Sequence, residues 1–154
     1  MQDRQAGDAS QAIIAPAIYR GVARLFHSLG FACASEITLG NSRRADVMAI
    51  SGDGAIVIVE IKSGAADFRA DTKWPEYLDY CDRFYFAAPP EMNLSIFPEQ
   101  EGLISADNYG ANILREAQVR KLAPARRRAL QLNFLHCAAN RLNMILDPGF
   151  RISN

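Results

Sequence analysis

RRADVMAISGDGAIVIVEIK, residues 43–62, is the stretch that decides the fold. It holds two segments of strand composition, residues 44–50 and 55–62, joined by Ser-Gly-Asp-Gly at residues 51–54. Gly and Asp between two apolar segments are the strongest hairpin signal in the chain. The segment Ala-Ile-Val-Ile-Val, residues 55–59, is apolar on both faces, which is typical of a central strand covered on both sides. The stretch therefore predicts a hairpin in the middle of a sheet.

Three charged side chains interrupt this hairpin. Glu60 and Lys62 share one face of the second strand, because strand side chains alternate. If the turn is a three-residue loop over residues 52–54, Asp46 lies opposite Glu60, with Cβ atoms about 5 Å apart. A two-residue loop shifts the register by one residue and turns Asp46 to the other face. The length of the loop therefore decides whether the three side chains meet.

Two carboxylates this close in a partly buried site repel each other unless a cation lies between them. Mg²⁺ takes oxygen ligands and needs few protein carboxylates, so Asp46 and Glu60 are candidate ligands, with the backbone carbonyl of Ile61 as a further oxygen. Such an ion activates water and stabilises negative charge on a phosphate. Lys62 would orient or deprotonate the water, or stabilise the phosphate charge; burial and the cation both lower its pKa. The alternative is a buried ion cluster without function, although uncompensated buried charges cost several kcal/mol each.

The rest of the chain supplies the other elements of an α/β fold. Apolar spacing predicts long helices near both ends, and short segments rich in β-branched and aromatic residues predict strands. The expected elements are a helix over residues 10–29, strands over 31–39, 83–88 and 103–105, a loop leading into a helix over 67–80, and a helix over 124–146. The order α-β-β-β-α-β-(β)-α predicts a mixed β-sheet flanked by helices.

Length and composition agree with a single domain. The 154 residues, 49% hydrophobic and 22% charged, suit one globular core and exclude a disordered or collagen-like chain. We expect a flexible N-terminus over residues 1–9 and one domain over residues 10–154. No apolar stretch reaches the about 18 residues of a membrane helix, and the first residues lack a signal-peptide pattern. We therefore expect a cytoplasmic, nucleoid-associated protein without membrane contact.

Cysteine and histidine chemistry is not expected. Cys33, Cys81 and Cys137 form no C-x-x-C pair, which argues against a disulfide framework and against a zinc site. His27 and His136 each lie in an apolar helical pattern, where a packed histidine is commoner than a catalytic base.

Charge is balanced overall, with 17 basic and 17 acidic residues, but residues 31–110 are acidic and residues 111–154 are basic. This asymmetry is compatible with an acidic cation site beside a basic surface that attracts phosphates. Arginines at the start of the last helix are unfavourable for the helix dipole unless an anion is bound there. The candidate phosphate contacts at that helix are Arg126, Arg127 and Arg128, and the alternative is a solvated basic face.

Four residues that follow Lys62 closely have two interpretations. In one, they border the site, and Lys73 contacts a phosphate. In the other, Asp67 or Asp71 caps the following helix, Lys73 is solvated and Trp74 packs in the core. We favour the structural role for the aspartates and for Trp74. For Lys73 the two interpretations have equal weight.

The pattern Arg43-Arg44-Ala45-Asp46 followed by Val59-Glu60-Ile61-Lys62 resembles the signature of the PD-(D/E)XK nuclease superfamily, which has the restriction-endonuclease-like fold. The chain is more narrowly similar to the MmcB-like DNA-repair endonucleases, through EIKSG at residues 60–64, DFRADTKW at 67–74, YCDRFYF at 80–86 and GLISAD at 102–107.

This resemblance implies a Mg²⁺- or Mn²⁺-dependent endonuclease that hydrolyses phosphodiester bonds in DNA repair. It assigns Asp46 and Glu60 as metal ligands and Lys62 as the catalytic lysine. DNA is the implied partner, with other DNA-repair proteins and a second copy of the chain as further candidates. The basic residues that we expect at the DNA are Arg43, Arg44, Lys73, Arg126, Arg127 and Arg128.

The sequence departs from the superfamily at two points. Ala45 stands where the motif has proline, and residues 11–30 lack the acidic residue that many members carry on the first helix. Glu36, on the first strand, is the nearest candidate for a third catalytic carboxylate. Two other functions stay open: a DNA-binding repair adaptor with an inactive nuclease fold, and a structural interaction subunit.

Overall fold

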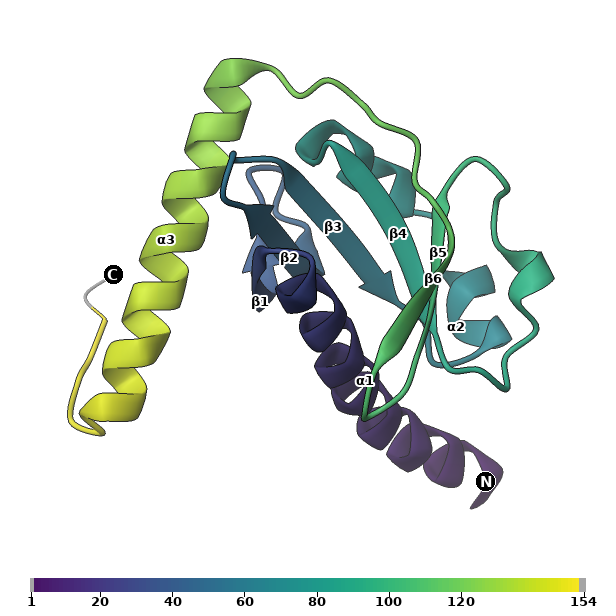
Figure 1. Ribbon diagram of the computed structural model, residues 1–154. Coiled ribbons are helices and arrows are strands. Elements are labelled where there is room, and N and C mark those ends of the chain that lie inside the picture. Colours follow the sequence, from purple (N-terminus) through teal and green to yellow (C-terminus); the bar gives the residue numbers. More distant parts are fainter. Residues whose placement is uncertain (1, 153–154) are drawn as a thin grey trace.

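The computed structural model describes residues 2–152, which form a six-stranded sheet flanked by helices (Figure 1). The elements in chain order are α1 (Gln2–Ser28), β1 (Phe31–Thr38), β2 (Arg44–Ser51), β3 (Ile56–Ile61), α2 (Ala65–Ala70), the 3-10 helix η1 (Trp74–Tyr80), β4 (Arg83–Ala88), the 3-10 helix η2 (Leu94–Ile96), β5 (Gly102–Ala106), β6 (Ala111–Arg115) and α3 (Pro124–Leu146).

The sheet keeps the chain order β1-β2-β3-β4-β5-β6. Strand β2 is antiparallel to both of its neighbours, β1 and β3; β3, β4 and β5 run parallel, and β6 returns antiparallel to β5. The predicted α/β fold with a mixed sheet is confirmed. All six side chains of β3 are buried, as its apolar composition predicts.

The β2–β3 hairpin has the register on which the site depends. Val47 lies opposite Val59, so the next position along the same register places Asp46 opposite Glu60. The turn is a three-residue loop, and Gly54 closes it with φ +89°. This left-handed conformation suits glycine, because it has no Cβ. The hairpin therefore has the three-residue turn that the proposed site requires.

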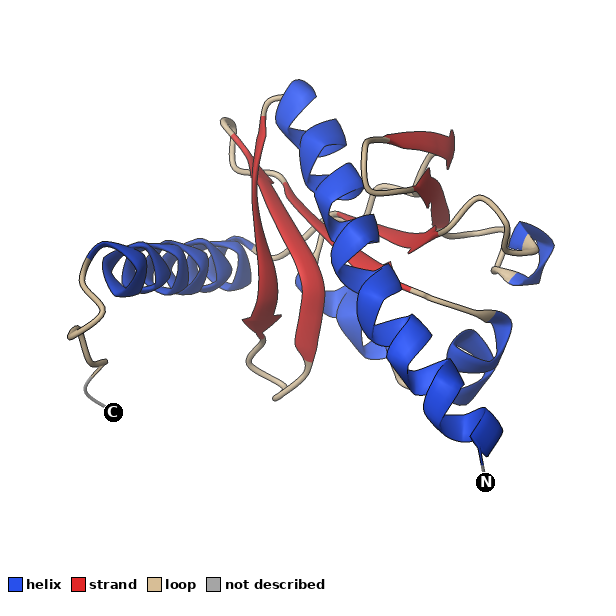
Figure 2. Cartoon of the chain, turned by 90° about the horizontal axis from the view of Figure 1, so that it is seen from below, coloured by secondary structure: helices blue, strands red, loops and turns tan. Residues whose placement is uncertain are grey.

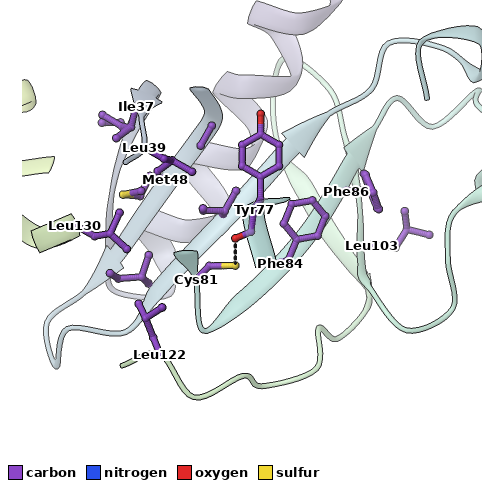
Figure 3. Packing of buried hydrophobic residues seen from close by; sticks show 14 of the residues in the cluster. Ile37, Leu39, Met48, Tyr77, Cys81, Phe84, Phe86, Leu103, Leu122 and Leu130 are labelled. Carbon is purple, nitrogen blue, oxygen red and sulfur yellow. Dashed lines mark hydrogen bonds between the residues drawn. The ribbon is translucent and has the colours of Figure 1, made fainter. Parts of the chain in front are cut away.

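Apolar side chains cover both faces of the sheet. On one face α1 crosses the strands and buries Ile18, Val22 and Phe26 against them (Figure 2). On the other face an aromatic cluster includes Phe84 and Phe86 from β4 and Tyr77 from η1, with Leu130 contributed by α3 (Figure 3). The sheet is thus the middle layer between two helical layers, and its ends are where polar side chains can gather.

Three elements differ from the sequence-based predictions. Helix α1 begins at Gln2 instead of Ser10, so residues 2–9, predicted to be flexible, are helical. The reason is that this polar segment contains no helix-breaking proline. The helix predicted over residues 67–80 is divided into α2 and η1, because Pro75 lacks an N–H and its predecessor disfavours α geometry.

Strand β6 was not predicted. It is short, and its side chains alternate between half-buried and exposed positions at the edge of the sheet. None of the helices in residues 2–152 combines the length and hydrophobicity needed to cross a membrane.

Candidate active site

The charged residues of the hairpin lie at one end of the sheet, where β2 begins and β3 ends. Asp46, Glu60 and Lys62 line a cavity of about 580 Å³. The rest of its wall comes from α1, β1, the end of β3 and α2, through Ala15, Pro16, Tyr19, Ser35, Glu36, Ile61 and Asp67. Strand periodicity and the three-residue turn therefore bring the three predicted side chains to one concave surface.

Each of the two carboxylates accepts a hydrogen bond from a backbone N–H of the opposite strand. The Asp46 N–H donates to Glu60 Oε1 at 3.1 Å, and the Ile61 N–H donates to Asp46 Oδ2 at 2.8 Å. Side chains thus replace backbone partners at this end of the β2–β3 pair. These bonds fix both carboxyl groups in position and occupy one oxygen of each.

Burial makes ionisation of this pair costly. Burial, together with the negative charge of Asp46, raises the pKa of Glu60 to about 9. Burial also raises the pKa of Asp46, against the hydrogen bond from Ile61 and the charge of Lys62. Two neighbouring carboxyl groups with raised pKa values, one buried and one half-buried, favour either a shared proton or a bound cation.

Lys62 is held by a second acidic residue. Its Nζ lies 2.6 Å from Asp71 Oδ2 and 4.0 Å from Glu60 Oε2, and the side chain is buried. Burial lowers the pKa of Lys62, but the contact with Asp71 and the charge of Glu60 outweigh it, so the pKa lies above its ordinary value. Burial therefore acts as predicted, but the contact with Asp71, which was not predicted, outweighs it, and Lys62 is a cation whose Nζ donates a hydrogen bond to Asp71.

The aspartates after Lys62 do not cap the following helix as predicted, because the N-caps of α2 and η1 are Gly64 and Lys73 and neither helix has a side-chain cap. Asp67 accepts hydrogen bonds from the Ser63 N–H at 3.1 Å and the Ser63 hydroxyl at 3.2 Å. Asp71 accepts from the Lys73 N–H at 2.9 Å as it pairs with Lys62. The ion pair with Lys62 was not predicted, because no local pattern links two residues on either side of a loop and a short helix.

Glu36 is not gathered with the other two carboxylates. It follows the β1–β2 register to a position opposite Asp46, but its φ of +51° interrupts the pairing there. The side chain is exposed and lies 3.5 Å from the guanidinium of Arg44. Residues 2–152 contain no group of three or more His, Cys, Asp or Glu side chains that could hold a metal ion. Glu36 therefore borders the cavity without completing a three-carboxylate site.

Two of the arginines predicted to contact DNA are engaged by carboxylates. Arg43 makes two hydrogen bonds to Glu76, at 2.6 and 3.0 Å. Arg127 makes two to Asp82, both at 2.6 Å, and one to the carbonyl of Gly54 at 3.0 Å. Both guanidinium groups therefore have carboxylate partners within the fold.

The basic segment at the start of α3 is far from the acidic cavity. Arg127 reaches Asp82, which accepts from the Ile56 N–H at the opposite end of β3, roughly 20 Å along the strand from Lys62. Arg126 donates to the carbonyl of Asp79 and lies 5.0 Å above the Tyr80 ring. Arg128 is exposed.

Exposed cations nearer the cavity are Arg44 and Lys73. Arg44 precedes Asp46 by two residues and shares its strand face, and Lys73 follows Asp71 by two residues. Trp74, the neighbour of Lys73, packs in the core as predicted: its ring centroid lies 5.7 Å from that of Phe84 and 5.3 Å from that of Phe86.

Two further residues line the cavity and a third supports its wall, and none of the three was predicted. Tyr19 lines it from α1, one turn after Ala15, and burial raises the pKa of its hydroxyl. Ser35 lines it from β1. Arg141 of α3 donates to the backbone carbonyls of Ser35 and Glu36 and so ties the long helix to this end of β1. The α1 face that carries Tyr19 is readable from helical spacing, but the contacts of Arg141 are not.

Comparisons with known proteins agree with this architecture. A family model described as "DNA repair protein MmcB-like" matches residues 2–149. A solved structure described as "SPO1766 protein of unknown function from Silicibacter pomeroyi" is 41% identical, with a TM-score of 0.88 over 91% of this chain and 97% of that chain. The search of curated proteins found no match.

Proposed function

Because this chain belongs to the MmcB-like family of DNA repair proteins, we propose that it is a metal-dependent DNA endonuclease of the PD-(D/E)XK type. The observation that carries the proposal is the opposed pair Asp46 and Glu60, a half-buried and a buried carboxyl group beside a buried lysine in one cavity. A domain gains no stability from two carboxyl groups that repel each other, so their presence favours a functional role.

The donor atoms suit a hard divalent cation. Each carboxyl group has one oxygen fixed by a backbone N–H, at 3.1 and 2.8 Å, and a second oxygen outside those two bonds. Asp46 and Glu60 would hold Mg²⁺ or Mn²⁺, and the carbonyl of Ile61 is a further candidate ligand. When bound, the ion would supply a Lewis acid for a phosphate oxygen and would lower the pKa of water.

Lys62 is suited to stabilise negative charge on the phosphate. The Asp71 carboxylate, 2.6 Å away, holds Nζ in place and keeps it protonated. A fixed cation next to the scissile phosphate favours the transition state, in which negative charge on the phosphate oxygens grows. We therefore assign charge stabilisation to Lys62, and orientation of Lys62 to Asp71.

We propose Arg44 and Lys73 as contacts to the DNA backbone near the cavity, because both are exposed and the ion pair of Arg44 with Glu36, at 3.5 Å, is itself exposed. Arg126 is a more distant candidate. Arg43 and Arg127 are not proposed, since Glu76 and Asp82 already neutralise them. Each phosphate contact should add nearly one unit to the dependence of log K on log salt concentration.

Cleavage assays on duplex, single-stranded and branched DNA with Mg²⁺ or Mn²⁺ test the proposal. We expect cleavage that disappears in EDTA and in Lys62→Ala, while salt-sensitive DNA binding survives in that variant. Lys121→Ala is the matched control, because Lys121 is exposed and lies near the start of α3. Binding without cleavage under any metal would indicate an adaptor, and the absence of both would indicate a structural subunit.

A further inference from the structure

Helix α3 carries most of the apolar surface that the fold leaves uncovered. Within the described residues, eleven large hydrophobic side chains are exposed, and six of them are on this helix. In Figures 1 and 2 the C-terminal half of α3 extends away from the sheet. An exposed apolar patch of this kind marks an interaction surface more often than a solvated face.

Four of these six residues, all leucines, follow a heptad spacing, and Met144 and Ile145 lie outside it. Starting from Arg128, the steps along the helix are four, three, four, three and four residues, which reach Leu132, Leu135, Ala139, Leu142 and Leu146. The four leucines are 47%, 61%, 55% and 73% exposed. We call Arg128, Ala139 and these four leucines the α3 seam. Alternating steps of three and four residues are the pattern by which one helix packs along another.

The α3 seam is separate from the face that packs on the sheet. The packed face carries Leu130, Phe134 and Cys137, which contact the core of the domain. The flank on the other side of the packed face is polar and carries Asn133, His136, Asn140 and Asn143. The helix therefore has three faces, and the seam is an apolar one without a partner in residues 2–152.

We propose that the α3 seam pairs with the seam of a second copy of this chain, with the two helices antiparallel. In the register that matches the spacing, Leu132 contacts the partner's Leu142 and Leu135 contacts the partner's Ala139. Each contact occurs twice, because a two-fold axis relates the copies. Small Ala139 opposite a leucine allows the two helices to approach closely.

Charge at the two ends of the seam favours an antiparallel second copy. The first turn of α3 has no acidic residue, and Asp147 is the C-cap of the helix. In the proposed register Arg128 lies beside the partner's Leu146 and Asp147. The arginine therefore meets the negative end of the partner helix and a carboxylate. Parallel pairing would instead place the arginines of both copies together.

The size of the seam suits a weak but specific dimer. Burying roughly 100 Å² on each leucine, together with Ala139 and the stem of Arg128, gives roughly 1,000 Å² for the two copies. This is the lower end of the range for specific interfaces, so we expect dissociation in the micromolar range. The inference does not depend on the proposed nuclease activity.

Sedimentation equilibrium tests the apolar part of the seam. We expect a dimer of the wild type, and dimerisation weakened at least about tenfold in Leu135→Asp and in Leu142→Asp, because a buried aspartate lacks a partner. Asn140→Asp introduces the same charge on the polar flank and should leave the dimer unchanged. Circular dichroism should show native helix content in all three variants, since Leu135 and Leu142 are exposed in one copy and Asn140 is half-buried.

A charge exchange tests the orientation. Arg128→Glu and Asp147→Arg should each weaken the dimer, whereas an equal mixture of the two variants should restore it, because each copy then supplies the opposite charge. A wild type that stays monomeric up to about 100 μM, where an interface of this size should associate, would overturn the proposal. A dimer that survives Leu135→Asp and Leu142→Asp, or a mixture that fails to associate, would overturn it as well.

Discussion

The two ends of β3 carry buried acidic residues in opposite electrostatic states. At the N-terminal end, Asp82 accepts from the Ile56 N–H at 2.8 Å and from Arg127 twice at 2.6 Å. Burial alone would raise the pKa of Asp82, but these bonds lower it below its ordinary value. At the C-terminal end, Asp46, Glu60 and Asp71 share one lysine, and the pKa of Glu60 is raised to about 9.

The difference separates a structural carboxylate at one end of β3 from the proposed ligand pair at the other end. Asp82 has one arginine for one negative charge and joins the β3–β4 region to α3. The pair at the other end has more carboxyl groups than cations and lines a cavity. A balanced ion pair stabilises the fold, whereas an unbalanced one costs stability and leaves room for a ligand.

The largest effect should be on catalysis, and only at the C-terminal end. Asp46→Asn removes a proposed ligand and should slow DNA cleavage by about a thousandfold or more. Asp82→Asn should leave the rate per folded molecule within about threefold. Single-turnover cleavage at a temperature where both variants are folded makes the comparison. Equal losses in the two variants would remove the distinction between the ends.

The free energy of unfolding should fall more in Asp82→Asn than in Asp46→Asn, the reverse of the order expected for catalysis. Asp82→Asn leaves Arg127 without its carboxylate and should lower the free energy of unfolding by about 2–3 kcal/mol, since the pair is partly buried. Asp46→Asn should cost less, because it relieves repulsion with Glu60. Urea unfolding of the metal-free proteins at pH 8 measures both. The distinction fails if Asp46→Asn is the more damaging change.

Glu60→Gln should stabilise the metal-free protein. Glu60 stays protonated in the folded state up to a pKa of about 9, well above its ordinary value, so the folded state binds more protons than the unfolded state between those values. Its contribution to stability is therefore present at low pH and is lost as pH rises toward 9. We expect Glu60→Gln to raise the free energy of unfolding by about 1–2 kcal/mol at pH 8 and to have little effect at pH 4.5. Unchanged stability at pH 8 would show that the buried carboxyl group of Glu60 does not destabilise the folded state.

The smallest effect should come from the turn that sets the register of both ends. Gly54→Ala places a Cβ in the left-handed conformation at φ +89°, where it would meet the Gln131 side chain at 2.6 Å. We expect a loss of about 1 kcal/mol in thermal unfolding with cleavage retained. Gly52→Ala is the matched control, since nothing lies within 4 Å of its added Cβ. Loss of cleavage in Gly54→Ala would show that the register itself had shifted.

The sequence was sufficient for the elements that depend on local pattern. The hairpin, the buried strand β3 and the bounds of α3 follow from turn residues, apolar runs and helix ends, and the structure confirms them. The opposition of Asp46 and Glu60 depended on one turn whose length the sequence left open, and the structure has the three-residue turn that brings the two together.

Partners contributed by distant segments were not predictable. Asp71 reaches Lys62 from beyond α2, and Asp82 reaches Arg127 across 45 residues. Such pairs depend on how the helices pack against the sheet, and this cannot be predicted from the spacing of residues within one segment. For the same reason the sequence grouped Arg127 with the DNA contacts, although the fold uses it to neutralise a carboxylate.

Titration of the metal-free protein with Mn²⁺ at pH 8, followed by calorimetry in two buffers of different ionisation enthalpy, tests whether the C-terminal end of β3 binds a cation. Wild type and Asp82→Asn should bind Mn²⁺ and release protons, because Glu60 must lose its proton to become a ligand. Asp46→Asn should not bind. If all three proteins bind Mn²⁺ alike, or if none does at millimolar concentration, the C-terminal end of β3 is not a cation site.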